Sequence, residues 1–211
     1  MVCQGDYLSD NGLRVAHAFW RTGLQYLDLV QSVAREAVAH KNTWVHIQDY
    51  DPDRDVAADY REATRWSDHR IIIPLLFNLL HGIELLAKGF LLAGSKPVAK
   101  NHKLPEMVAL VRAAFPAEGT INDVFAKYTT EAQMPPLLRD FLTDNRISVD
   151  ALYQALRYPN PDWESIHRYV ELMRKGGAGI PFLSGLDSDI EALTLASVAL
   201  GRRLEAGSSH G

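Results

Sequence analysis

The chain contains a single cysteine, Cys3, in 211 residues. One thiol cannot form an intrachain disulfide, and it cannot supply a zinc site that needs two or more cysteines. The sequence also lacks an excess of positive charge, because its formal net charge is −4. These absences exclude a disulfide-stapled scaffold and a generally basic nucleic-acid-binding surface, but they leave room for a local basic patch.

Several short motifs that carry chemistry are missing as well. The sequence has no His-Glu-x-x-His zinc motif, no Gly-x-Ser-x-Gly nucleophile turn and no glycine-rich phosphate loop. No segment alternates apolar and polar residues as a half-buried strand does, and there is no internal repeat. The chain does not begin with the charged-then-apolar pattern that directs secretion, so we expect a cytoplasmic protein.

The most informative stretch is apolar. Between positions 71 and 92 nearly every residue is apolar, and the polar exceptions Asn78, His81, Glu84 and Lys88 are spaced three, three and four residues apart. This spacing places the four side chains in one stripe on an α-helix. A helix that is apolar on its other sides is buried, so we expect the central helix of the fold rather than a membrane span.

The polar stripe has two interpretations. It is either a narrow solvent-facing seam, in which Glu84 and Lys88 form an i,i+4 ion pair, or a polar groove that receives a ligand or partner. A metal site is not expected. His81-x-x-Glu84 has no second copy on a facing helix, whereas di-iron bundles take their ligands from several helices.

Helical periodicity recurs along the rest of the chain. It predicts a first long helix over residues 9–39 and the central helix over 68–93. A capping box, Ser188-x-x-Glu191, marks the start of the last helix. Shorter helices are expected at about 55–66, 104–114, 121–130, 136–142, 148–156 and 162–173.

This inventory predicts an all-α fold. We expect an up-and-down helical bundle with two long core helices and a peripheral set of shorter helices. The prediction is a single domain over residues 1–205, followed by a disordered tail at 206–211, which is short, small and polar.

Two loop regions carry further candidate residues. His102 lies between Lys100 and Lys103 just before a predicted helix, where it either fixes the turn or belongs to an anion site, since helix N-termini favour negative charge. Arg157 and Tyr158 end another helix. They are either a helix cap or an arginine and a stacking ring presented to a nucleotide.

Three of these stretches resemble the HEPN superfamily. They read HGIELLAKGFLLAG, NHKLPEMVALV and ALRYP, and the matching positions are Glu84, Lys88, His102 and Leu104, with Arg157-Tyr158-Pro159 at a later helix boundary. The resemblance implies an up-and-down helical bundle that is often dimeric. Members of the superfamily include ribonucleases, toxins paired with nucleotidyltransferase antitoxins, and non-catalytic nucleotide or RNA binders.

The catalytic members of that superfamily carry an arginine, four to six residues and then a histidine on a late helix. Arg35-x4-His40 and Arg203-x6-His210 fit this spacing, which is about the number of matches expected by chance. The first pair lies in the wrong helix and the second ends in the predicted tail. The sequence therefore departs from the catalytic pattern.

We accordingly expect a non-catalytic HEPN-like protein that binds a nucleotide, RNA or a protein partner, in a toxin–antitoxin or stress and defence context. Its contact residues would be Glu84, Lys88, His102, Arg157 and Tyr158, with no cofactor, no metal and no membrane. The resemblance implies a homodimer and a nucleotidyltransferase-like partner protein. Two alternatives stay open: a metal-independent endoribonuclease with a divergent site, in which a histidine acts as acid and base, and a purely structural interaction protein.

Overall fold

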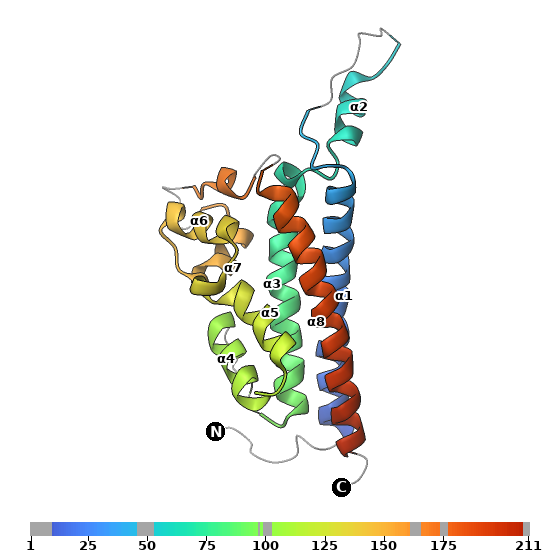
Figure 1. The fold of residues 1–211 in the computed structure, drawn as a ribbon, viewed down its shortest axis with the longest axis vertical. Coiled ribbons are helices and arrows are strands. Elements are labelled where there is room, and N and C mark those ends of the chain that lie inside the picture. Colours follow the sequence, from blue (N-terminus) through green and yellow to red (C-terminus); the bar gives the residue numbers. More distant parts are fainter. Residues whose placement is uncertain are drawn as a thin grey trace. The chain divides into compact units, whose positions relative to one another are not determined.

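Three long helices carry most of the fold: α1 (Asp10–Ala39), α3 (Asp68–Ala93) and α8 (Gly179–Ser208) (Figure 1). The computed structural model describes residues 10–45, 53–96, 98, 103–160, 166–173 and 177–208. No β-strand occurs in these ranges, so the described chain is all-α, as predicted.

Shorter helices connect the long ones. Their order follows the predicted pattern, with Pro136 and Ser148 starting or capping helices as expected. They are α2 (Val56–Ala63), α4 (Leu104–Ala114), α5 (Gly119–Thr129), α6 (Pro136–Asn145) and α7 (Val149–Arg157), with 3-10 turns η1 (Glu131–Gln133) and η2 (Tyr169–Leu172).

The last helix corrects one prediction. α8 begins at Gly179 rather than at Ser188, so the fold has three long helices and not two. Pro181 is tolerated because it lies in the first turn, where backbone N–H groups have no partner within the helix. The Ser188 hydroxyl does not cap a helix start but donates to the Ser184 carbonyl within α8, at 3.2 Å. The helix also includes the first three residues of the predicted tail.

The predicted helix over 162–173 is also corrected. Within its described part only η2 is helical, and the Ile166 and Val170 side chains that were expected to face inward are exposed. The Tyr169 hydroxyl donates instead to the backbone carbonyls of Ala155 and Tyr158, which holds this short turn against the end of α7. Residues 161–165 lie outside the described part of the chain.

The chain divides into two compact units, and each long helix contributes residues to both. The first unit contains Met1–Asp28, Asn78–Met134 and Asp189–Gly211, and the second contains Leu29–Phe77 and Pro135–Ser188.

In the first unit, α1 and α3 approach each other closely because both carry glycine at the contact. A Cβ placed on Gly23 would lie 3.0 Å from the Gly82 carbonyl oxygen and 3.0 Å from the Leu86 backbone nitrogen. An aromatic cluster packs beside this contact. The Phe90 ring meets Trp20 edge-on with centroids 5.0 Å apart, and it also contacts Phe115 and Phe125.

In the second unit, a buried carboxylate ties the segment that follows α1 to the start of α3. Asp68 accepts hydrogen bonds from Asn42 Nδ2 at 2.7 Å and from Trp44 Nε1 at 2.6 Å, while its own backbone N–H donates to Asn42 Oδ1. Asn42 has a φ of 48°, a left-handed conformation that asparagine tolerates better than most residues. The buried charge is therefore satisfied by two donors and by the N-terminus of α3.

The prediction of a buried central helix is confirmed. Within the described residues, α3 is the one helix long and apolar enough to cross a membrane, judged by length and composition alone. Leu76, Ile83 and Phe90, spread along its length, are buried against the chain's own side chains. Packing inside the protein accounts for the apolar composition of α3.

Substituting Gly23 by alanine should destabilise the fold by about 1–2 kcal/mol, because the added methyl group meets backbone atoms that cannot turn aside. Urea unfolding measures the change. The matched control is Gly185→Ala within α8, where an added Cβ meets nothing within 4 Å. That variant should gain up to about 1 kcal/mol from helix propensity. Equal effects in the two variants would contradict the close approach of α1 and α3.

The stability of the second unit should fall as the pH drops below the usual pKa of histidine. Burial, and then the neighbouring Arg70 guanidinium, lower the pKa of His69 from its usual value of 6.5. The unfolded chain therefore binds more protons than the folded chain just below pH 6.5, and acidification favours unfolding. We expect the loss of unfolding free energy between about pH 7.5 and about pH 5.5 to be smaller in His69→Gln than in the wild type. An equal loss in His69→Gln and in the wild type would show that another group causes the pH dependence.

Candidate functional site

Two of the predicted site residues form a buried ion pair on α3. The Glu84 side chain is 1% exposed, and its Oε1 lies 2.6 Å from Lys88 Nζ. His81 Nδ1 lies 3.7 Å from the other carboxylate oxygen, and the His81 ring packs edge-on against Tyr26 of α1 with centroids 4.7 Å apart. The stripe is therefore not a fully solvated seam, since its central carboxylate is shielded from water.

The other three predicted residues do not join this pair in a described site. His102 lies outside the described residues. Arg157 and Tyr158 end α7 in the second unit, where both side chains are exposed and the guanidinium lies 5.3 Å from the tyrosine ring centroid. Arg157 and Tyr158 thus form an exposed cation–π pair by themselves.

Arg35 and His40, the first pair with the catalytic arginine–histidine spacing, both make structural contacts. Arg35 Nε donates to Asp187 Oδ1 at 2.8 Å, and the same oxygen accepts from Gln31 Nε2, so this arginine fastens α1 to α8 inside the second unit. His40 follows the end of α1, and its Nδ1 lies 3.5 Å from Glu36 Oε2 in the last turn of that helix. Both side chains therefore take part in surface or helix-to-helix contacts.

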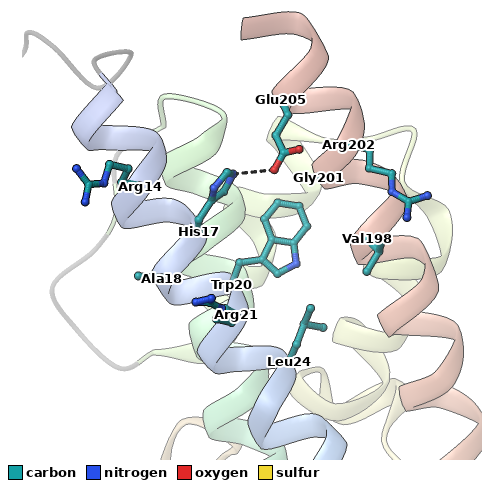
Figure 2. A pocket seen from close by; sticks show the side chains of 10 residues that line it. All are labelled: Arg14, His17, Ala18, Trp20, Arg21, Leu24, Val198, Gly201, Arg202 and Glu205. Atoms are coloured by element: carbon teal, nitrogen blue, oxygen red, sulfur yellow. Dashed lines mark ion pairs between the residues drawn. The ribbon is translucent and has the colours of Figure 1, made fainter. Parts of the chain in front are cut away.

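A pocket that the sequence did not predict lies between α1 and α8 in the first unit. Its volume is about 650 Å³, within the usual range for small-ligand sites. Figure 2 shows side chains of both helices around it, with Trp20 between the two helices. The lining residues are Arg14, His17, Ala18, Trp20, Arg21 and Leu24 of α1 and Val198, Gly201, Arg202 and Glu205 of α8.

The floor of this pocket is the Trp20 indole. Trp20 is only 7% exposed, and Gly201 of α8 provides the space for its ring. A Cβ on Gly201 would lie 2.3 Å from Trp20 Cη2, which no packed structure accommodates without moving the ring. Leu24 and Val198 add further apolar surface beside the indole. The pocket therefore offers a flat apolar base.

The rim of the pocket is positively charged. Arg14, Arg21 and Arg202 are exposed, and none forms an ion pair with any residue in the part of the chain that the structure describes. The one acidic group, Glu205, has its Oε1 3.2 Å from His17 Nε2 across the two helices (Figure 2). Three arginines against one carboxylate give a net positive rim, in a protein whose formal net charge is −4.

The sequence held a signal for this pocket. Positions 14, 17, 18 and 21 follow i, i+3, i+4, i+7 spacing on α1, and positions 198, 201, 202 and 205 repeat it on α8, so each set occupies one helix face. This spacing places Arg14 and Arg21 on one surface face of α1, but it cannot supply the second helix that turns the surface into a pocket.

The chemistry available here is anion binding rather than metal binding. Among the described residues, no group of three or more histidine, cysteine, aspartate or glutamate side chains is placed to hold a metal ion. Guanidinium groups bind carboxylates and phosphates through paired N–H donors, and they stay charged at every physiological pH. An apolar floor next to such groups fits a ligand with a flat body and an anionic end.

Comparison with known proteins adds no further assignment. No protein-family model matches the chain, and no curated protein and no solved structure matches it either.

Removing the amine of Lys88 should destabilise the protein by about 3 kcal/mol, because it leaves the Glu84 carboxylate buried without its cation. Lys88→Met is the test variant, and the free energy of unfolding in urea is the measurement. The double variant Glu84→Gln/Lys88→Met should recover most of the loss, since no charge is then buried. A loss below about 1 kcal/mol in Lys88→Met would mean that the pair behaves as an exposed ion pair.

Proposed function

We propose that this chain is a non-catalytic, HEPN-like binding protein whose ligand carries nucleotide phosphate, either as a free nucleotide or within RNA. The binding site that we assign is the pocket between α1 and α8. The observation that carries the proposal is that three arginines, none with an ion pair among the described residues, line the same pocket as the Trp20 indole.

The ligand class follows from the pairing of charge with apolar surface. Arginine is the preferred side chain for phosphate because its planar fork donates two parallel hydrogen bonds. The Trp20 floor, with Leu24 and Val198, would receive the base or sugar. A simple inorganic anion would use the rim and leave the apolar floor uncovered, so a nucleotide makes fuller use of the site.

His17 and Glu205 give the pocket a polar contact between its two walls. Both side chains are about half exposed, and their ion pair spans α1 and α8. Glu205 also brings the only negative charge into the lining, so it opposes an incoming phosphate. We therefore propose that binding separates this pair, or positions the phosphate on the arginine side of it.

The experiment is isothermal titration calorimetry of the purified chain with AMP, ADP, ATP and a short oligouridylate, each at two salt concentrations. We expect binding that weakens as salt rises, because the exposed guanidinium groups are screened. Replacing Arg14, Arg21 or Arg202 by glutamine should weaken it by about tenfold each, the loss expected for one charge-assisted contact. The triple variant should show no binding.

The matched control is Arg112→Gln. Arg112 is exposed on α4 in the same unit but does not line the pocket, so its loss changes the net charge equally without touching the site. If Arg112→Gln weakens binding as much as the pocket variants, the attraction is general electrostatics and the assigned site is wrong. Cleavage of the oligouridylate in the presence of EDTA would instead favour the endoribonuclease alternative.

A further inference from the structure

The pocket between α1 and α8 changes from polar to apolar along its length. At its polar end, His17 Nε2 of α1 lies 3.2 Å from Glu205 Oε1 of α8 (Figure 2). Further along α1 the Trp20 ring lies against Gly201, and Leu24 continues the apolar lining about one turn later. A ligand with a flat body and an anionic end therefore fits in one orientation, with its anionic end beside His17.

The chain's own carboxylate already occupies this polar end. His17 lies between Arg14 and Arg21 on one face of α1, three residues after the first and four before the second. The Glu205 carboxylate, which carries two oxygens on one carbon, thus stands where the oxyanion of a ligand would also be within reach of arginine. The His17 and Glu205 side chains are 45% and 57% exposed, and ion pairs that exposed to water hold only weakly. A stronger anion can therefore displace Glu205.

Displacement of a carboxylate selects ligands by their charge. An internal phosphate of RNA is a diester with one negative charge, the same as Glu205, so exchanging the two gains no attraction to the arginines. A terminal phosphate monoester carries about 1.5 to 2 negative charges at neutral pH, so the exchange becomes favourable. Three arginines and one glutamate leave two net positive charges in the described lining, which a terminal phosphate neutralises.

On the basis of the nucleotide site assigned above, we propose that this pocket takes the terminal phosphate of a nucleotide, and that the phosphate displaces Glu205 from His17. His17 Nε2 then donates to a phosphate oxygen between Arg14 and Arg21. Glu205 is the specificity-determining residue, because a phosphate with a single charge does not gain enough attraction to replace it. The ligand class is thereby a free nucleotide, or an RNA end that carries a phosphate monoester, rather than the interior of an RNA strand.

Two pairs of ligands that differ in the phosphate test the selection by charge. The first pair is AMP and adenosine 3′,5′-cyclic monophosphate, which share a base and a sugar but carry a monoester and a diester. The second pair is a short oligouridylate with and without a 5′-phosphate. In calorimetric titrations of the full chain at about pH 7.5, we expect the monoester of each pair to bind about tenfold more tightly, because it brings nearly one more negative charge to the arginines.

Variants of the two polar residues test the displacement. Glu205→Gln should tighten AMP binding about fivefold, because the competing charge is gone. Asp123→Asn is the matched control and should leave the affinity unchanged, since Asp123 is exposed on α5 in the same unit but does not line the pocket. Adding His17→Ala to Glu205→Gln should weaken AMP binding about tenfold, because the phosphate loses a donor. Far-UV circular dichroism checks that each variant is folded.

The outcomes separate this inference from the nucleotide site on which it rests. Equal affinities for AMP and the cyclic nucleotide overturn the selection of a terminal phosphate, while the site itself stands if Arg21→Gln still weakens both. Equal tightening in Glu205→Gln and Asp123→Asn overturns the role of Glu205, because any lost negative charge would then have the same effect. An unchanged affinity when His17→Ala is added to Glu205→Gln overturns the role of His17 as a phosphate donor. If none of the four ligands binds to the wild type or to Glu205→Gln, the site and the inference both fail.

Discussion

The close backbone approach of α1 and α3 is the constraint on which the first unit depends. Gly23 and Gly82 face each other, and Gly89 lies against the α1 backbone near Ala16 and Trp20. The indole of Trp20 packs edge-on against Phe90 of α3 and also lies against Gly201 of α8. The same approach fixes which sides of α1 are buried, so it also decides which sides of α1 remain exposed to solvent.

Helical periodicity was sufficient to predict the elements whose apolar faces are long. The first helix was expected over 9–39 and the central one over 68–93, and the structure places them at Asp10–Ala39 and Asp68–Ala93. The last helix was predicted too short because the capping box Ser188-x-x-Glu191 was taken as its start, whereas α8 begins at Gly179. Gly179 and Pro181 are harmless at a helix start, where Pro181 loses no hydrogen bond.

Sites depend on which helices become neighbours, and a single sequence gives little of that information. The Glu84–Lys88 pair was predicted because its partners are four residues apart on one helix. The arginine-rimmed pocket was not predicted, because Arg21 and Arg202 are separated by most of the chain. They line one pocket only because α1 packs beside α8. Even the burial of Glu84 follows from tertiary packing rather than from its spacing.

The contact between Trp20 and Gly201 has a consequence for how this protein can evolve. No side chain fits at position 201 while the indole occupies that space, so a mutation at 201 is harmful unless position 20 has already become smaller. A change at position 20 can come first, because a smaller residue there leaves a cavity that a later substitution at position 201 can fill. Lineages that change the pocket floor should therefore show a fixed historical order: the aromatic ring is lost first, and the glycine is replaced afterwards.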